Sequence, residues 1–480
     1  MPLKFYNTFE KREQEFIPLR KGKVTMYTCG PTVYGRPHIG NYSSFLMADI
    51  LRRWLEVSGY KVTHVKNITD VGHLVADQDE GEDKVQKEAE KQKVDPLTIA
   101  KKYTEMYLED EKALNMVEPE HRPRATEYVQ QMIDITKTLV EKGNAYETED
   151  GVYFAVETFP AYGKLSGNTL DKLNAGARIS VDEAKKHPAD FALWKKCVGK
   201  NAHHVLKWPS PWGDGFPGWH IECSAMSSSL LGDEIDIHTG GEDNIFPHHE
   251  CEIAQSECCT GTHPFVRTWL HKRRIDLAGE KMSKSLGNVL SIPDIVAKGF
   301  SPLDIRYYFL SVHYRTNLKF SFEGLESARK VRLKIVEWME TCTSNAVSAV
   351  PHPNGETDPA IASAREEFTN AMDSDLNTPG ALAPVFTLMN HYYALRTKKA
   401  PLFKEDVRAL EEFLGIVRRT FGCFESVVSA VPAEVQALLA EREQARAAKD
   451  FTASDRLRDD IKKLGYEVRD AEGKQTVKKL

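Results

Sequence analysis

The chain has 480 residues, of which 41% are hydrophobic and 28% are charged, and its formal net charge is -6. Because single domains usually stop growing near roughly 250–300 residues, we expect about three domains. No apolar run reaches the roughly 20 residues of a membrane span, and the amino terminus lacks the order of a signal peptide, so we expect a cytoplasmic protein with no membrane partner. Eight cysteines in a chain of this length suit metal ligands or buried thiols better than disulfides.

The amino-terminal part alternates between strand and helix patterns. Residues 24–29 are β-branched and aromatic, residues 30–40 are rich in Gly and Pro, and apolar residues then recur at helical spacing from 46 to 55. Residues 61–68 form a second strand candidate. Such alternation is typical of a doubly wound parallel sheet, so we predict an α/β, Rossmann-like catalytic domain.

The middle of the chain changes character. Residues 146–212 are rich in Gly, Pro and Trp, and strand character returns at 235–238, which indicates an insertion between two halves of the sheet. The charged run at 76–94 is typical of a solvated face or a flexible loop. We therefore predict the first half of the nucleotide-binding fold at 1–143, a connective insertion at 144–213 and the second half at 214–275.

The carboxyl-terminal part is mostly helical after about residue 320, and residues 466–477 form a candidate hairpin around Glu472 and Gly473. We predict a lysine-loop and stem-contact region at 276–322, a helical bundle at 323–428 and a small α/β region at 429–480. Four arginines near the end alternate with acidic residues, which favours intrahelical ion pairs over an RNA-facing surface: Arg442, Arg446, Arg456 and Arg458.

A first candidate phosphate site is the sequence His38-Ile39-Gly40-Asn41, between the first strand and its helix. Free backbone N–H groups and the helix dipole favour an anion there. His38 and Asn41 are three residues apart and can both face phosphate oxygens, while Gly40 lets a flat adenine approach the backbone. Alone this motif is weak, because a helix cap with a surface histidine would read the same.

A second candidate is Lys281-Met282-Ser283-Lys284-Ser285, followed by a glycine at 287. Paired ammonium groups of Lys281 and Lys284 on a mobile loop suit a transition state in which negative charge builds on pyrophosphate. In this order the two motifs resemble those of class I aminoacyl-tRNA synthetases, which implies ATP with Mg²⁺ and an adenylate intermediate. The family's first motif usually ends in His. Asn41 at that place can donate a neutral hydrogen bond but not a cationic one.

Four residues supply ligand types that suit zinc: Cys29, Cys223, His248 and Glu252. His248 and Glu252 are four residues apart, so on a helix they face the same side. Spacing alone does not establish a site, because no local C-x₂-C pair is present and buried cysteines beside a surface helix would give the same pattern. Cys251, Cys258 and Cys259 lie nearby and leave the assignment open.

The segments around these residues resemble the cysteinyl-tRNA synthetase family. The resemblance is carried by residues 28–34, 218–226 and 246–252, and also by 190–195, 208–213 and 269–271. It implies that Cys29, Cys223, His248 and Glu252 hold one zinc ion that binds the substrate thiolate. It also implies that L-cysteine is joined to tRNA(Cys) through an adenylate, and that the last region binds the anticodon. A thiolate is a far better zinc ligand than a serine hydroxyl, so no editing site is expected.

The same resemblance implies further site residues. Thr69, Trp219 and Asp243 should line the amino-acid pocket, with the Asp243 carboxylate on the α-ammonium, although core packing or a helix cap would explain each of them as well. Three residues should lie at the nucleotide crevice, under ribose or adenine: His238, Gly240 and Gly241. The family's short acidic run after Thr-Asp is replaced here by residues 71–84, which we interpret as a small insertion.

Two other functions fit part of the sequence. A related cysteine ligase that acts on an amino sugar would share the catalytic body but would not need the carboxyl-terminal helical region. A non-catalytic, zinc-stabilised RNA-binding module would not need intact histidine and lysine motifs. We therefore expect a cysteine–tRNA ligase that acts as a monomer.

Overall fold

The computed structural model describes most of the chain in two compact units, Met1–Phe424 and Glu425–Leu480. The described residues are 2–71, 84–170, 185–277, 280–281, 289–344, 349–398, 403–425, 433–448, 450–471 and 474–479. Of the predicted features, Lys284, the residues around His73 and the hairpin tip at Glu472 and Gly473 lie outside these ranges. Among the described residues, no helix is both long and apolar enough to cross a membrane.

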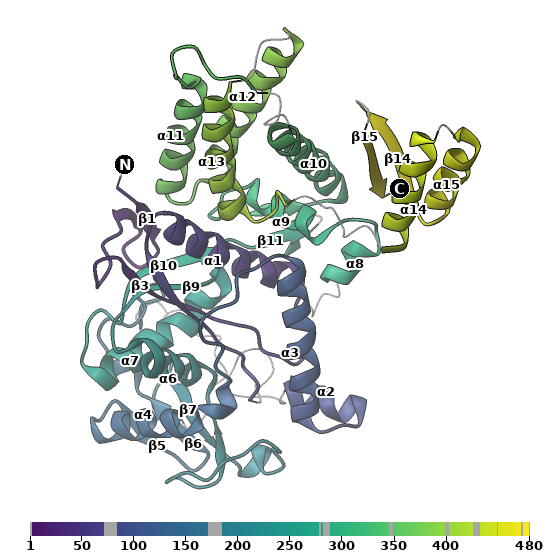
Figure 1. Ribbon diagram of the computed structural model, residues 1–480. Coiled ribbons are helices and arrows are strands. Elements are labelled where there is room, and N and C mark those ends of the chain that lie inside the picture. Colours follow the sequence, from purple (N-terminus) through teal and green to yellow (C-terminus); the bar gives the residue numbers. More distant parts are fainter. Residues whose placement is uncertain are drawn as a thin grey trace. The chain divides into compact units, whose positions relative to one another are not determined.

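A four-stranded parallel sheet forms the centre of the first unit, in the order β10-β9-β3-β4. Strand β3 thus lies between β4 and β9. Figure 1 shows the purple strand β3 beside the teal strands β9 and β10, which come more than 200 residues later in the chain. The predicted doubly wound α/β fold is confirmed. The strands are β3 (Lys23–Thr28), β4 (Lys61–Lys66), β9 (Ile235–Gly241) and β10 (Val266–Lys272).

Helices cover both faces of this sheet, as its sequence pattern requires. Val24 and Met26 pack on one face with residues of α1 (Ile39–Val57), and Tyr27 packs on the other with residues of α6 (Trp219–Leu231). Successive side chains of a strand point to opposite faces, so a sheet buried on both faces needs apolar residues in succession. This explains why Met26 and Tyr27, which are neighbours in β3, are both apolar and fully buried.

The connection between β4 and β9 contains helices and a second sheet. The antiparallel sheet has the order β5-β6-β7-β8, formed by β5 (Ala145–Glu147), β6 (Gly151–Phe154), β7 (Phe191–Lys196) and β8 (Gly215–Pro217). The charged run at 76–94 contains α2, which buries Val85 and Ala89 and exposes its charged side. The helices before the sheet are α2 (Lys84–Gln92), α3 (Pro96–Ala113) and α4 (Val129–Glu141). Single-turn helices lie at Ala125–Glu127, Val156–Thr158 and Gly199–Asn201.

After β10 the chain forms a small sheet and a set of packed helices. The sheet order is β12-β11-β13, from β11 (Ile275–Leu277), β12 (Glu280–Lys281) and β13 (Leu318–Phe320). At the other end of the chain, an amino-terminal hairpin pairs β1 (Lys4–Asn7) with β2 (Arg12–Glu15). Helix α7 (Glu250–Thr260) lies between β9 and β10 in the chain. The helices after β10 are α8 (Ile292–Val296), α9 (Pro302–Leu310), α10 (Phe322–Ser344), α11 (Pro359–Asp373), α12 (Thr378–Thr397) and α13 (Lys404–Phe421).

The second unit has its own small core. Helices α14 (Ala433–Ala447) and α15 (Phe451–Lys463) pack on the antiparallel pair β14 (Tyr466–Ala471) and β15 (Lys474–Lys479). Arg442 is 1% exposed and donates from Nη1 to Gln475 Oε1 at 2.9 Å. It therefore does not lie on a surface that could face RNA.

Candidate active site

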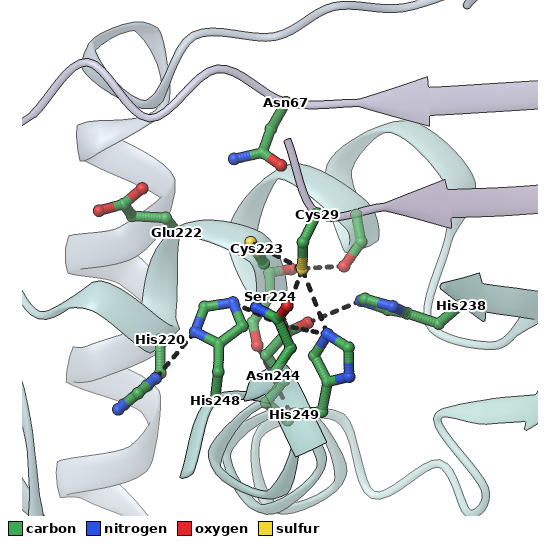
Figure 2. A network of polar contacts seen from close by, with 12 residues as sticks. Cys29, Asn67, His220, Glu222, Cys223, Ser224, His238, Asn244, His248 and His249 are labelled. Carbon is green, nitrogen blue, oxygen red and sulfur yellow. Dashed lines mark hydrogen bonds and ion pairs between the residues drawn. The ribbon is translucent and has the colours of Figure 1, made fainter. Parts of the chain in front are cut away.

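The four predicted metal ligands come together at the carboxyl end of the central sheet. Cys29 follows β3, Cys223 lies on α6, His248 lies on the single-turn helix Ile245–His249, and Glu252 lies on α7. The Cys29 and Cys223 sulfurs are 3.9 Å apart, Cys29 Sγ is 3.6 Å from Glu252 Oε1, and His248 Nε2 is 2.9 Å from Glu252 Oε1. Figure 2 shows the side chains of Cys29, Cys223 and His248 close together.

These distances fit a tetrahedral metal site. With zinc–sulfur bonds of about 2.3 Å, two tetrahedral thiolate ligands would lie about 3.8 Å apart, close to the observed 3.9 Å. All four residues are buried, and no ligand atom is more than 4.8 Å from another. A second group within the same limit shares Cys29 and Glu252 but replaces the other two ligands by His238 and His249. The first group has two sulfur donors, which suits zinc better.

Electrostatics prepare this cluster for a cation. Although burial opposes a charge, Glu252 and Cys223 raise the pKa of His248 to about 10. Against the same burial, His238 and His248 lower the pKa of Glu252 to about 2. The hydrogen bond from Cys29 lowers the pKa of Cys223 to about 6, while burial raises that of Cys29 well above its ordinary value. A bound cation would therefore displace protons from Cys29 and His248 at neutral pH.

Histidines that the sequence did not single out surround the ligands. His220 Nδ1 lies 3.0 Å from His248 Nδ1, and His249 Nδ1 lies 2.7 Å from His271 Nε2. His238, predicted at the nucleotide crevice, is fully buried, and its Nε2 lies 3.0 Å from Glu252 Oε2. Apart from the prediction for His238, the adjacent pair at 248–249 was the only sequence signal for this group. The histidines fix the orientation of the ligands, as second partners do around metals generally.

A chain of hydrogen bonds joins the loop after Cys29 to α6. The Gly30 N–H donates to Asn67 Oδ1 at 2.8 Å, Asn67 Nδ2 donates to Thr69 Oγ1 at 3.1 Å, and Thr69 Oγ1 donates to Glu222 Oε2 at 2.8 Å. Thr69 was predicted in the amino-acid pocket, whereas Asn67 and Glu222 were missed. Burial and the neighbouring Cys223 raise the pKa of Glu222 well above its ordinary value.

The other two predicted pocket residues lie on different elements. Trp219 is half-buried at the start of α6, and its ring centroid is 4.4 Å from that of His248. Asp243 is exposed on the single-turn helix Glu242–Asn244, directly after β9. Trp219 therefore borders the four candidate metal ligands, and Asp243 lies beyond the carboxyl end of the sheet.

The first phosphate motif forms the beginning of α1. His38 is the N-cap residue, and its backbone N–H donates to Asn41 Oδ1 at 3.0 Å. The His38 ring lies over Gly40, where an added Cβ would come within 2.8 Å of Cε1. The Asn41 side chain is exposed, but its oxygen is already used in this cap. Asn41 therefore stabilises the start of α1, which the sequence pattern did not reveal.

The glycines predicted under the nucleotide have close neighbours within the protein. A Cβ on Gly240 would come within 2.6 Å of His249 Cε1, and one on Gly241 within 3.2 Å of Ser44 Oγ. A glycine is thus required at position 240 because the His249 ring packs against it, beside the four candidate metal ligands.

A backbone hydrogen bond joins the first phosphate motif to the segment after the lysine loop. The Ile39 N–H donates to Leu290 O at 2.8 Å, which ties the start of α1 to the segment that follows the lysine loop. Lys281 ends β12, which pairs with β11 in antiparallel register. Arg36, another residue missed from the sequence, holds the first motif against α3 through a bidentate bond to Asp110 at 2.9 and 2.6 Å.

Comparison with known proteins places this site in a family. Residues 15–330 match the family model described as tRNA synthetases class I (C) catalytic domain. Over 477 residues and 98% of both chains, the sequence is 41% identical to the cysteine–tRNA ligase of Thermus thermophilus. It is also 42% identical to that of Thermococcus onnurineus over 480 residues and 98% of both chains. The chain belongs to the cysteine–tRNA ligase family.

The rest of the chain matches this family as well. Residues 367–424 match the DALR domain, and residues 429–477 match the cysteinyl-tRNA ligase anticodon binding domain. The chain therefore resembles cysteine–tRNA ligases over 98% of its length, including the carboxyl-terminal part that an amino-sugar ligase would not need.

Solved synthetases share the fold. The methionyl-tRNA synthetase of Mycobacterium tuberculosis bound by methionyl-adenylate aligns with a TM-score of 0.59 at 16% identity, over 90% of this chain and 96% of that one. A LeuRS–tRNA–LeuAMS complex from Agrobacterium radiobacter aligns with a TM-score of 0.61 at 11% identity, over 85% of each chain. At such identities the likeness concerns the fold of class I synthetases and not the substrate.

Proposed function

We propose that the chain activates L-cysteine with ATP to cysteinyl-adenylate and transfers the cysteinyl group to the 3′ end of tRNA(Cys). The observation that carries this proposal is the four-residue cluster Cys29, Cys223, His248 and Glu252, buried beside the ends of β3 and β9 in a member of this family. In open α/β sheets, ligands bind outside the carboxyl ends of the strands. A thiol-binding metal site there sits where an amino acid would bind.

The four residues of the cluster would hold one zinc ion. When bound, zinc would supply a soft Lewis acid that takes a thiolate in preference to a hydroxyl. Serine lacks the thiolate that zinc binds, and the loss of this bond would discriminate against serine by more than the roughly 1–3 kcal/mol that a hydrophobic pocket gains from one methylene group. The buried histidines around the ligands would keep them in orientation, and the chain would need no editing site against serine.

The amino-acid pocket would lie between the cluster and the phosphate motifs. Thr69 connects both, because its hydroxyl donates to Glu222, which precedes Cys223, and its backbone pairs with Pro31 and Val33 on the way to His38. Trp219 would cover the thiol end, since its ring contacts His248. The Asp243 carboxylate would hold the α-ammonium.

ATP would bind at the start of α1, with Mg²⁺ on its phosphates. The N-terminus of α1 and His38 would hold phosphate oxygens, and Lys281 and Lys284 would stabilise charge on pyrophosphate. Gly40 and Gly241 would lie along the adenosine, with Gly240 and His238 behind them. Asn41 would act mainly through its cap bond to His38.

The reaction follows from this placement. The cysteine carboxylate attacks the α-phosphorus of ATP, the bond to the β-phosphate oxygen breaks, and pyrophosphate leaves. The terminal adenosine hydroxyl of tRNA then attacks the carbonyl carbon, and AMP leaves. No side-chain nucleophile is required, so the residues act by positioning and charge stabilisation. Lys284→Ala should therefore slow adenylate formation by orders of magnitude.

The remaining predicted regions have roles in this scheme. We propose that residues 144–213 form the connective insertion, that 276–322 carry the lysine loop and contact the acceptor stem, and that 323–428 form the helical bundle. Residues 429–480 would read the anticodon. We further propose that the chain acts as a monomer in the cytoplasm, where its substrates occur.

The test is a charging assay with the purified full chain. ATP, labelled cysteine and tRNA should give acid-precipitable cysteinyl-tRNA, and serine at the same concentration should give none. Charging of an amino sugar in place of tRNA would favour the alternative ligase. An absence of both products from zinc-loaded protein would refute the proposed function.

A further inference from the structure

An ion pair joins two neighbouring strands of the central sheet at the point where the chain leaves each of them. In β9 and β10, Gly241 and Lys272 are the last paired residues. The next residues are Glu242 and Arg273, and Arg273 Nη1 donates to Glu242 Oε2 at 2.8 Å. Arg274 adds a bond from its backbone N–H to Glu242 Oε1 at 3.3 Å. We call Glu242, Arg273 and Arg274 the strand-end clamp.

The two arginines of the strand-end clamp project from a backbone that is itself held by hydrogen bonds. The Arg273 N–H donates to Tyr314 O at 2.9 Å, and Arg273 O accepts from Lys272 Nζ at 2.9 Å. Arg274 O accepts from the Leu318 N–H at 3.3 Å. The arginines are therefore set in position by their own backbone, and the bonds to the carboxylate transmit that position to the end of β9.

The strand-end clamp stands between the two halves of the proposed active site. On the β9 side, Glu242 lies between Gly241, proposed along the adenosine, and Asp243, proposed on the α-ammonium. The same segment continues to the candidate metal ligand His248. On the β10 side, the two arginines lead into β11, whose antiparallel partner β12 ends at Lys281. The clamp thus joins the segment that would bind cysteine to the segment that would bind pyrophosphate.

Charge holds Glu242 in place as well as hydrogen bonds. Its side chain is 14% exposed, whereas that of Arg273 is 58% exposed. Burial lowers the pKa of the neighbouring Lys272 to about 8, against the opposing effect of Glu242. An ion pair with an exposed partner contributes little to overall stability. Its removal should therefore leave the protein folded, so that an effect on the reaction can be measured by itself.

From this arrangement we propose that the strand-end clamp positions the cysteine carboxylate for its attack on ATP. It fixes the turn that carries Asp243 relative to the strand pair that ends at Lys281, so the α-ammonium and the phosphates are held in one geometry. These are positioning residues, because their effect reaches the substrates through neighbouring residues. The proposal rests on the proposed function and concerns the first step. Once the adenylate has formed, its covalent bond holds the two halves together, and transfer to tRNA no longer needs the clamp.

The other end of the same two strands provides a matched control. Arg267 Nε donates to Glu234 Oε1 at 2.7 Å, and the two side chains are 43% and 28% exposed. Glu234 directly precedes β9, and Arg267 is the second residue of β10. This pair also joins β9 to β10, but it lies at the amino ends of the strands, away from the proposed site. Glu234→Gln is therefore the control for Glu242→Gln, since both changes keep the side-chain shape and remove one charge.

The experiment separates the two steps of the reaction in the full-length, zinc-loaded chain. For Glu242→Gln and for Arg273→Gln, kcat of cysteine-dependent pyrophosphate exchange should fall by about tenfold, because a small misplacement of reacting groups is costly. KM for cysteine and for ATP should stay within about twofold. Single-turnover transfer to tRNA(Cys) from added cysteinyl-adenylate should also stay within about twofold. The double variant should lose no more than either single variant, because both residues act through one interaction. Glu234→Gln should change none of these values.

Four results would overturn the proposal. Equal losses in exchange and in transfer would mean that the strand-end clamp only supports the catalytic fold. An equal loss in Glu234→Gln would mean that any ion pair between β9 and β10 has the same effect. Unchanged exchange in both Glu242→Gln and Arg273→Gln would mean that the clamp does not position the substrates, and additive losses in the double variant would mean that the two residues act separately. Failure of the proposed function is distinguishable, because the unaltered chain would then show no cysteine-dependent exchange at all.

Discussion

The sulfur atoms of Cys29 and Cys223 lie 3.9 Å apart, although 194 residues separate them in the sequence. Cys29 directly follows the first strand of the parallel sheet, and Cys223 lies on a helix that comes after the whole insertion. The fold thus brings two thiols to one buried point with His248 and Glu252.

Replacing one sulfur should remove the metal. Cys223→Ser should reduce bound zinc from about one ion per chain to a small fraction, because a hydroxyl is a poor substitute for a thiolate. Zinc is measured by atomic emission on the dialysed protein. Cys197→Ser is the control, since Cys197 is a half-buried free thiol outside the cluster. A full complement of zinc in Cys223→Ser would contradict the assignment.

Two adjacent histidines distinguish the two groups that could hold a metal. His248 belongs to the group with both cysteines, and His249 to the group with His238. We expect His248→Gln to lose zinc and His249→Gln to retain it. His249 Nδ1 bonds to His271 Nε2, and in the proposed site His249 only packs beside the four zinc ligands. The opposite result would move the metal to the second group.

Loss of the Asn67 side chain should affect cysteine more than ATP. Asn67→Ala removes the bond that orients the Thr69 hydroxyl, and one such bond in a buried site is worth about 1 kcal/mol, or roughly a fivefold rise in KM for cysteine. KM for ATP in pyrophosphate exchange should stay unchanged. Asn144→Ala is a matched control, because Asn144 makes the same kind of bond to Thr158 Oγ1 at 3.1 Å in the insertion. Equal effects on both substrates would argue for a general defect of the fold.

The buried carboxylate of Asp49 should make stability depend on pH. Despite burial, Arg306 and Arg53 lower its pKa in the folded protein. A lowered pKa stabilises the fold above the unfolded value of about 3.9, and this contribution is lost as the pH falls through the folded value. Asp49→Asn should therefore lower Tm clearly at pH 7 and much less near pH 3. A Tm difference that is the same at both pH values would show that the charge of Asp49 is not the cause.

Much of the fold follows from local patterns in the sequence. The strands predicted at 24–29 and 61–68 differ from β3 and β4 by two residues or fewer at each end, because β-branched and aromatic runs bounded by Gly and Pro act locally. The region after about residue 320, predicted to be mostly helical, contains the long helices α10 to α13. The spacing of apolar residues, together with the Gly and Pro residues of the turns, is sufficient to predict such elements.

The candidate site was less predictable because it depends on contacts between distant segments. The four candidate metal ligands were assigned through a family resemblance, because the sequence has no local C-x₂-C pair and the spacing of His248 and Glu252 alone does not establish a site. Asn67, Glu222 and His271 gave no local signal, because their partners lie on other elements. Asn41 has the position of a phosphate ligand in sequence, but its oxygen caps α1.

The central claim is that a zinc ion on Cys29, Cys223, His248 and Glu252 selects cysteine by its thiolate. X-ray absorption at the zinc edge of the loaded full-length chain, without and with saturating cysteine, tests it most directly. We expect about two sulfur neighbours in the free protein, as for an S₂NO site, and one more with cysteine, with no change on adding serine. A sulfur count that stays the same on adding cysteine would contradict it.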